Sequence, residues 1–360
     1  MKTKNSARLA GLMAIALLAA CKVDYQPGGA EKDEKSSASA GGGLSFADVR
    51  DQTVRPRPDR LLQTQVVLER LGFSSGTLDG KDGANFRAAL RAFQDTHDLN
   101  ANGKLDEPTV RALARWTDVP ATRVVRIPAD FARGPFVPNF PKDAQLQAKL
   151  PVLGYRNLVE ALAERFHTTP ETLVALNRRG TVARADAVIQ VPAVADIAPP
   201  APQKDDRGWS RTLQWLAVSP DQPKADRVVV DKSEGVLRAF DTDGRLIAQF
   251  PATMGSEHDP LPLGQWKIQG VSRNPDFHYN PKLFWDVSDS KQPVLLKPGP
   301  NGPVGVVWID LSKPHYGIHG TGEPQSIGRA ESHGCVRLTN WDAARLAGMV
   351  EAGTKVLFQA

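Results

Sequence analysis

Apolar residues recur at helical spacing between positions 59 and 116. Two faces follow this period, formed by Leu61, Val66, Leu68 and Leu71 and by Phe86, Ala89, Leu90 and Phe93. The first face ends at Gly72, which suits a helix C-terminus. A third short helix is expected to start near Asp106-Glu107-Pro108, because acidic residues and proline favour a first turn. The pattern predicts a small three-helix bundle over residues 59–117.

The next stretch mixes short helical and strand patterns. Residues 118–150 are a proline-rich connection whose strand-like segment TRVVRIP is either linker or an extension of a neighbouring domain. In residues 151–195, one helix face repeats apolar residues, a second helix starts at Pro170, and AVIQVP is a short strand. The first face consists of Leu158, Ala161, Leu162 and Phe166. These elements predict a small α/β module that lacks an opening strand.

Residues 196–207 contain APPAPQKDD, a linker composition. Beyond them, short alternating segments are separated by Gly and Pro, which is typical of an all-β sandwich or barrel. Within 208–360 only residues 341–351 have a helical pattern, and KVLFQ is a closing strand. The chain is therefore predicted to be a multidomain α+β protein with a mostly-β C-terminal domain.

The N-terminus has the pattern of an export signal. Basic residues precede the apolar run LAGLMAIALLAA and Cys21, and this run is too short to span a bilayer as a helix. We therefore expect residues 1–21 to be removed or modified as a signal segment. Residues 22–58 are rich in Gly, Ser, Ala and Lys and are predicted to form a flexible tether.

Composition excludes few classes but does argue against nucleic acid as a partner. The 360 residues are 41% hydrophobic and 24% charged, which is ordinary for globular domains. The formal charge is +5, from 45 Lys and Arg against 40 Asp and Glu, and three of the basic residues lie in the signal segment. The sequence contains no basic tract with interleaved aromatic residues.

The candidate chemistry is concentrated in residues 318–342, IHGTGEPQSIGRAESHGCVRLTNWD. Cys335 is the only cysteine besides Cys21, and a lone thiol in an exported protein is a candidate nucleophile. A thiol reacts as thiolate and so needs a base or a positive field nearby. His333 and His319 both precede Cys335 at distances that a folded loop can close. Gly334 would let a substrate carbonyl approach the backbone.

These motifs resemble known families of cell-wall proteins. Ile318-His319-Gly320, followed by Ser332-His333-Gly334-Cys335-Val336-Arg337 and Asp342-Ala343, resembles the L,D-transpeptidase (YkuD-type) catalytic domain and covers about residues 208–360. LGF, AL-x-x-FQ and GKLDEPT resemble a three-helix peptidoglycan-binding domain. RFHTTPETLVALN resembles the second half of a LysM-type module, although a structural spacer is equally compatible. Leu18-Ala19-Ala20-Cys21 resembles the lipobox of bacterial lipoproteins, with sorting to the outer membrane the expectation.

The resemblance implies roles for individual residues. Cys335 would attack the L,D-amide before the terminal D-Ala of a peptidoglycan tetrapeptide stem, and His319 would be its base. The carbonyl of Gly320 would hold the imidazole in one tautomer. Backbone N–H groups of Gly334 and Cys335 would form the oxyanion hole. The remaining expected site residues are Ser332 and His333 as supporting groups and Arg337 and Tyr316 as substrate-binding groups.

Several alternatives stay open at this stage. Water could replace the amine acceptor, which gives an L,D-carboxypeptidase, or the acceptor could be a protein side chain or a D-amino acid. A non-catalytic tether between membrane and wall is the competing class. His315, His319, His333 and Cys335 include zinc-ligand types, but no CxxC or HExxH frame is present, so we expect no metal and no organic cofactor. The predicted location is the cell envelope, facing the periplasm. The oligomeric state does not follow from the sequence.

Overall fold

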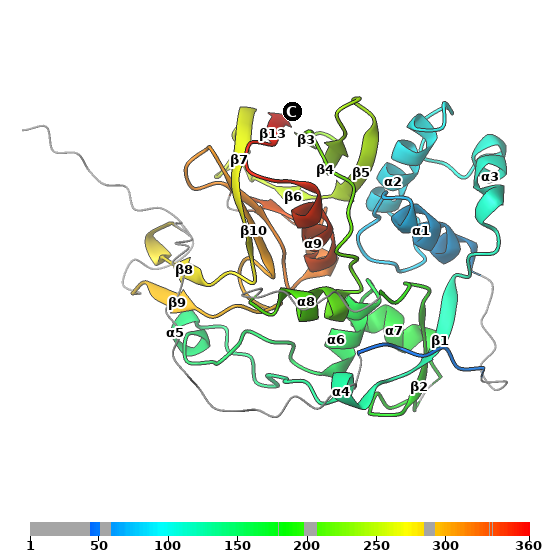
Figure 1. The fold of residues 1–360 in the computed structure, drawn as a ribbon, viewed down its shortest axis with the longest axis horizontal. Coiled ribbons are helices and arrows are strands. Elements are labelled where there is room, and N and C mark those ends of the chain that lie inside the picture. The colour runs from blue at the N-terminus through cyan, green and yellow to red at the C-terminus, as the bar shows by residue number, and fades with distance from the viewer. Residues whose placement is uncertain are drawn as a thin grey trace, which may run out of the picture.

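The structure is a computed structural model that describes residues 44–50, 59–178, 180–197, 207–283, 292–330, 332 and 334–360. The predicted signal segment with Cys21, and His333, lie outside these residues. Within them, no helix is both long and apolar enough to cross a bilayer. Figure 1 shows three parts, which we call the helical domain (59–117), the middle module (118–197) and the C-terminal domain (207–360).

The helical domain is the predicted three-helix bundle. Its helices are α1 (Arg60–Arg70), α2 (Ala84–Asp95) and α3 (Glu107–Leu113), and α3 runs into a 3-10 turn at Ala114–Trp116. Asp59 and Asp106 cap α1 and α3 by accepting backbone N–H bonds, and Gly72 follows α1 with a φ of +99°. Leu68, Leu90 and Phe93 are fully buried between the helices.

The middle module has the opening strand that the sequence analysis expected to be missing. Strand β1 (Thr122–Arg126) pairs antiparallel with β2 (Val188–Pro192), with Val124 opposite Gln190. Between them lie α4 (Ala129–Ala132), α5 (Ala144–Gln147), α6 (Leu158–Arg165) and α7 (Pro170–Leu176). The sequence leaves the strand-like segment TRVVRIP either in a linker or in an extension of a neighbouring domain, and the structure shows the second. The assignment stayed open because the partner strand lies more than sixty residues away and a proline-rich insertion separates β1 from α6.

The prediction of a flexible tether over residues 22–58 is wrong for residues 44–50. Phe46 is 1% exposed and packs edge-to-face against Phe131 and Phe166, with ring centroids 5.0 Å apart in both pairs. Its backbone N–H donates to Asp196 Oδ2 at 2.7 Å. A single aromatic residue in a polar segment produces no periodicity, so the sequence pattern could not reveal this packing.

The C-terminal domain begins with a helix that the sequence analysis did not expect. Helix α8 (Trp209–Leu216) precedes the strands, whereas only residues 341–351 were predicted to be helical. Trp215 of α8 stacks on Phe131 of the middle module with centroids 4.2 Å apart. Helix α8 has only two turns and its N-cap, Gly208, makes no side-chain capping bond, so the usual start signal is absent.

Nine strands form the sheet of the C-terminal domain, in the order β5-β4-β3-β13-β7-β10-β11-β12-β6. Their bounds are β3 (Arg227–Asp231), β4 (Val236–Phe240), β5 (Leu246–Pro251), β6 (Thr253–Met254), β7 (Gly264–Arg273), β10 (Val307–Leu311), β11 (Gly317–His319), β12 (Val336–Arg337) and β13 (Lys355–Gln359). The two outermost strands, β5 and β6, are separated only by Ala252. The sheet therefore curves back on itself like a barrel, which confirms the mostly-β prediction.

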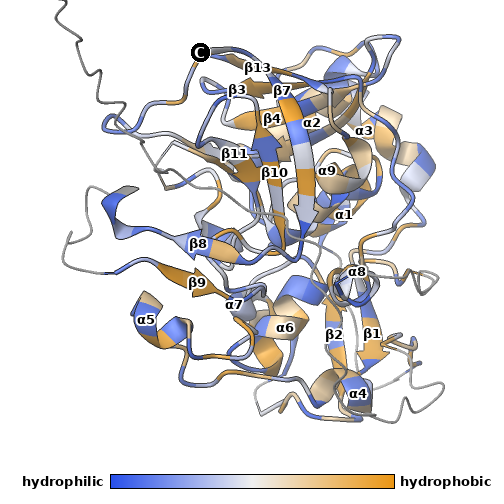
Figure 2. Ribbon diagram, turned by 60° about the vertical axis from the view of Figure 1, so that its left-hand side comes forward, coloured by the Kyte–Doolittle hydropathy of each residue, from blue (hydrophilic) through white to orange (hydrophobic). Residues whose placement is uncertain are grey.

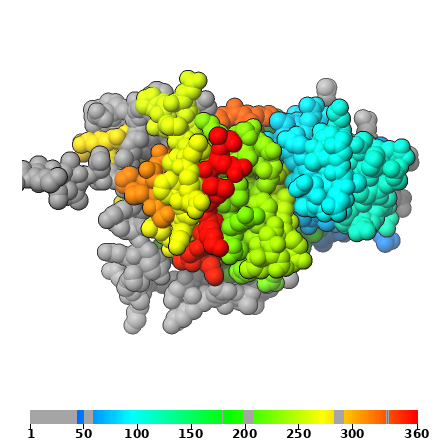
Figure 3. All heavy atoms as spheres, turned by 90° about the horizontal axis from the view of Figure 1, so that it is seen from above, coloured from blue at the N-terminus to red at the C-terminus, as the bar shows by residue number. Residues whose placement is uncertain are grey.

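Hydrophobic and hydrophilic residues follow each other along β7 (Figure 2), as expected for a strand with one buried face. Figure 3 shows β7, β13 and the β3–β5 strands side by side, with the helical domain next to the β5 edge. A separate pair, β8 (Phe277–Tyr279) and β9 (Val294–Leu296), lies beside the middle module.

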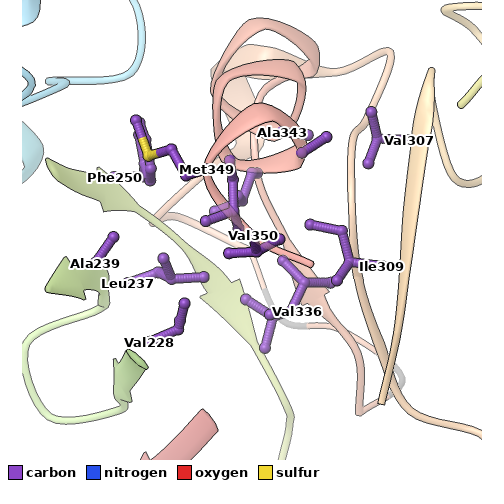
Figure 4. Close-up of a cluster of buried hydrophobic side chains, with 14 of the residues drawn as sticks. Val228, Leu237, Ala239, Phe250, Val307, Ile309, Val336, Ala343, Met349 and Val350 are labelled. Atoms are coloured by element: carbon purple, nitrogen blue, oxygen red, sulfur yellow. The ribbon is translucent and has the colours of Figure 1, made fainter. Parts of the chain in front are cut away.

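Helix α9 (Asn340–Met349) fills the curved sheet. In Figure 4, Ala343 and Met349 of this helix and Val350 after it face side chains from both halves of the sheet. The labelled strand residues are Val228, Leu237, Ala239, Phe250, Val307, Ile309 and Val336. Thr339 caps the helix by accepting the N–H of Asp342 at 3.1 Å. The helix and this core fix the strands that carry the candidate site.

Candidate active site

Strand pairing aligns the candidate residues in one row. Trp308 of β10 is opposite His319 of β11, and His319 is opposite Arg337 of β12. Arg337 is in turn opposite Thr253 of β6. Residues directly opposite each other in a sheet point to the same face, so this register brings together side chains that are far apart in sequence.

His319 is buried and uncharged. It is 4% exposed, and its ring stacks on that of Trp308 with centroids 5.7 Å apart. Burial, together with the nearby charge of Arg337, lowers the pKa of His319 to about 3. Nδ1 lies 2.7 Å from the carbonyl oxygen of Gly320, and since a carbonyl only accepts, Nδ1 carries the proton. Nε2 is then a lone-pair acceptor.

Cys335 is half-buried and directly precedes β12. It packs against a small apolar cluster that includes Leu153 and Trp308, and its Sγ lies 3.9 Å from the carbonyl oxygen of His315. A negative charge on Cys335 favours the protonated form of Arg337, and the attraction is mutual, so this guanidinium favours the thiolate.

Ser332 and Gly334 shape the loop that carries the cysteine. The Ser332 hydroxyl donates to the Cys335 carbonyl at 2.6 Å and accepts the Gly255 N–H at 2.7 Å. Gly334 has a φ of +95°, and a Cβ there would lie 2.8 Å from the Tyr316 ring. Only glycine satisfies both conditions without strain. Tyr316 therefore packs directly on the residue before the cysteine.

Arg337 and Tyr316 both lie close enough to Cys335 for the charge of its thiolate to shift their pKa values. Burial lowers the pKa of Arg337, while the charges of Cys335 and Glu323 oppose that shift. Burial also raises the pKa of Tyr316, and negative charge on Cys335 and Asp259 adds to the increase. The structure thus gathers Cys335, His319, Gly320, Ser332, Gly334, Arg337 and Tyr316 at one place.

The metal alternative is not supported by the geometry of His315. This residue precedes β11 and has a φ of +76°, so it does not lie on the strand that carries His319. Among the described residues, no three His, Cys, Asp or Glu side chains are grouped to hold a metal ion. His333, the fourth member of that set, lies outside the described residues.

Asn340 is a site residue that the sequence analysis missed. Its side chain is fully buried, and Oδ1 accepts the Val306 N–H at 3.2 Å. A Cβ on Gly320 would lie 2.3 Å from this Oδ1, so Gly320 packs directly on the amide. The only signal in the sequence was the helix start Thr339-Asn340-Trp341-Asp342, which predicts a cap and says nothing of Asn340 itself.

The sequence matches two families. Residues 225–357 match the family described as "L,D-transpeptidase catalytic domain", and residues 57–113 match "Putative peptidoglycan binding domain". A protein of Bacillus licheniformis named "Putative L,D-transpeptidase YkuD" is 36% identical over 130 residues, which is 36% of this chain and 63% of that protein. A Bacillus subtilis protein of the same name is 56% identical over 114 residues, 32% and 54% of the two chains.

The chain therefore spans between half and two thirds of the curated relatives that it matches. These matches confirm the resemblance to an L,D-transpeptidase catalytic domain preceded by a peptidoglycan-binding domain. Among solved structures, an L,D-transpeptidase from Xylanimonas cellulosilytica aligns over 84% of this chain and 94% of its own, with 16% identity and a TM-score of 0.34.

Proposed function

We propose that this protein is a peptidoglycan L,D-transpeptidase that acts through a thioester on Cys335. The observation that carries the proposal is that two neighbouring strands hold a half-buried thiol, Cys335, just before β12, and a buried, neutral histidine in β11 whose Nδ1–H is held by the Gly320 carbonyl. This is the arrangement required of a cysteine nucleophile and its base, with a carbonyl in the position that an acid occupies in a Ser-His-Asp triad. The family matches support the substrate class.

The first half-reaction breaks one amide bond. Cys335 Sγ attacks the carbonyl carbon before the terminal D-Ala of a tetrapeptide stem, and His319 Nε2 takes the thiol proton. The negative oxygen of the tetrahedral intermediate accepts N–H bonds from Gly334 and Cys335. As the C–N bond breaks, His319 returns the proton to the D-Ala amine, which leaves. The acyl group remains on sulfur.

The second half-reaction reverses these roles. The amine of a neighbouring stem attacks the thioester carbon, His319 takes a proton from that nitrogen, and the C–S bond breaks. The proton then passes to the departing thiolate, so the enzyme returns to its starting state and a 3→3 cross-link forms. Arg337, with its charge beside Cys335, stabilises the thiolate in both halves and, with Tyr316, binds the stem. No metal or organic cofactor takes part.

The upstream parts fit the same role. The helical domain would bind the wall, and the middle module would either bind glycan or space the domains. Acylated Cys21 would anchor the chain to a membrane facing the periplasm. Peptidoglycan stems and glycan are then the partners, within the cell envelope.

Incubation of purified protein with disaccharide-tetrapeptide muropeptides, followed by mass spectrometry, tests the proposal. We expect dimers that have lost one D-Ala, absent with Cys335→Ala. Tripeptide monomers alone would instead establish an L,D-carboxypeptidase. Unchanged muropeptides that remain bound would establish the tether. The resemblance also leads us to expect that carbapenems acylate Cys335 and add their mass to the wild-type chain but not to Cys335→Ala.

A further inference from the structure

The catalytic His-Gly segment lies against a buried amide. Gly320, whose carbonyl binds His319, sits between Gly305 and Asn340, and a Cβ on Gly305 would come within 2.9 Å of the Gly320 Cα. The Gly320 N–H donates to the Val307 carbonyl at 3.3 Å. Gly320 is therefore positioned by packing against the Asn340 side chain as well as by its bond to β10, and its carbonyl is positioned with it.

The orientation of the Asn340 amide is set from its Nδ2 side. Nδ2 donates to Glu164 Oε1 at 2.8 Å and to the Pro300 carbonyl at 3.0 Å, which leaves Oδ1 for the Val306 N–H. Rotating the amide by 180° would place the NH₂ group against another N–H donor. Glu164 is the side-chain partner that opposes this rotation, and it belongs to α6 of the middle module.

Glu164 is itself held in place. It is 3% exposed, and Tyr155 donates its hydroxyl to Oε2 at 2.7 Å. The ring of Tyr155 stacks on the ring of Trp215 of α8, with centroids 5.7 Å apart. The charged group facing Glu164 is Glu160 on the same helix, which pairs with Arg156 and accepts a bond from Asn301 at 3.2 Å. Burial of this carboxyl raises its pKa to about 8, so it is protonated at neutral pH.

We propose that Glu164 of the middle module is a positioning residue for the catalytic base, acting through Asn340 on the Gly320 carbonyl that orients His319. This inference rests on the proposed function, and it gives the middle module a part in catalysis beyond spacing or wall binding. A displacement of the Gly320 carbonyl would loosen the Nδ1–H bond and reduce the fraction of His319 with Nε2 free to accept the thiol proton.

The test compares Glu164→Leu, Glu164→Gln and Glu160→Leu in the full chain. Readouts are the rate of Cys335 acylation by imipenem, followed by mass spectrometry, and kcat and KM for muropeptide cross-linking. Glu164→Leu should lower the acylation rate and kcat about ten-fold and leave KM within two-fold. Glu164→Gln, which mimics the protonated carboxyl, should stay within three-fold of wild type. Glu160 lies at the same interface but bonds neither to Asn340 nor to Gly320, so Glu160→Leu should stay within two-fold of wild type.

A folded Glu164→Leu protein with wild-type acylation would overturn the inference, as would an equal loss in Glu164→Leu and Glu160→Leu. If Glu164→Leu does not fold, Tyr155→Phe decides, because it deletes one oxygen and keeps the ring stacking. It should lower acylation about three-fold, and an unchanged rate counts against the role.

Failure of the proposed function can be distinguished from failure of the inference about Glu164. If the proposed function is wrong, the wild-type protein will neither be acylated nor cross-link muropeptides. In that case long-range ¹H–¹⁵N spectra of labelled histidine still report the inference. His319 should be the Nδ1–H tautomer in wild type and a mixture of tautomers in Glu164→Leu or, if that variant does not fold, in Tyr155→Phe. A single unchanged tautomer in the variant measured would refute the inference.

Discussion

The C-terminal domain meets its two upstream neighbours in different ways. The helical domain joins the β5 edge through backbone: Ser74 N–H donates to the Gln249 carbonyl at 2.8 Å, and Gln249 N–H donates to the Gly72 carbonyl at 2.9 Å. The middle module also makes backbone bonds to this domain at Leu153, but it reaches the segment that carries His319 and Gly320 through side chains, since Glu164 binds Asn340 at 2.8 Å. The first contact extends a sheet, whereas the second one supports the loop of the candidate site.

This difference separates stability from chemistry. Backbone pairing at a sheet edge orders a neighbouring domain without specifying any side chain in the site. A buried polar network specifies the geometry of each of its members, and losing one leaves the others unsatisfied. Changes at the middle-module contact should therefore reach the cysteine reaction, whereas changes at the β5 edge should affect mainly folding.

The largest expected effect comes from the matched pair Asn340→Ala and Gln249→Ala. Asn340→Ala removes the bonds that Asn340 makes to Glu164 Oε1, the Pro300 carbonyl and the Val306 N–H, so it should cost about 3–5 kcal/mol of unfolding free energy and at least ten-fold in Cys335 acylation. Gln249→Ala loses the bond from its Nε2 to the Ala88 carbonyl at 2.9 Å. Gln249→Ala should lower the unfolding free energy by about 1–3 kcal/mol and keep the rate of Cys335 acylation within two-fold of wild type.

Urea unfolding and imipenem acylation measure the two quantities on the same samples. The comparison fails if Gln249→Ala slows acylation as much as Asn340→Ala does. Equal stability losses with unequal acylation losses would be its strongest support.

A second, smaller effect is a difference in pH dependence, because each contact buries one carboxyl. Burial raises the pKa of Glu164 to about 8 and that of Asp342, which accepts the Ser74 hydroxyl at 2.9 Å, to about 6. Both folded-state pKa values exceed those of the unfolded chain. The stability that these two carboxyls contribute is therefore greatest in acid and is lost as pH rises towards each folded pKa.

Thermal unfolding between pH 4 and 9 separates the two groups. Glu164→Gln should remove the loss of stability between about pH 6 and 8, and Asp342→Asn should remove part of the loss between about pH 4 and 6. The assignment is wrong if Glu164→Gln leaves the alkaline part of the profile unchanged.

The sequence predicted the parts of this site that are local. His319, Gly320, Ser332, Gly334 and Cys335 stand in one motif-bearing stretch, and the three-helix bundle and the closing strand follow from short-range periodicity. Glu164 could not be found in this way, since it looks like an ordinary polar residue of an amphipathic helix. Its partner is 176 residues away, and only the tertiary fold makes them neighbours.

The same limit explains the errors in the fold. The sequence could not place strand β1 in a sheet or the residue Phe46 in a core, because each is defined by a distant partner. Helix α8 lacks a capping side chain at its N-terminus, and its Trp215 packs on Phe131 of the middle module. In each case the deciding interaction was non-local.

The smallest expected effect concerns Asn85, where the helical domain does touch the catalytic loop. Its Nδ2 donates to the Ile327 carbonyl at 3.0 Å, and Gly328 packs so closely that a Cβ would lie 2.5 Å from Asn85 Oδ1. The Gly328 N–H is also held by Thr253 Oγ1 at 2.8 Å, so the loop keeps a second support from β6 when Asn85 is lost. Asn85→Ala should therefore lower the unfolding free energy by about 1 kcal/mol.

The effect of Asn85→Ala on acylation should be no more than about three-fold, and Thr253→Val, which removes the second support, is the matched variant. The loss of acylation in the double variant should exceed the sum of the losses in the two single variants, because only the double variant removes both bonds to the Ile327-Gly328 segment. A ten-fold loss in Asn85→Ala alone would mean that the helical domain, and not only the middle module, positions the catalytic loop.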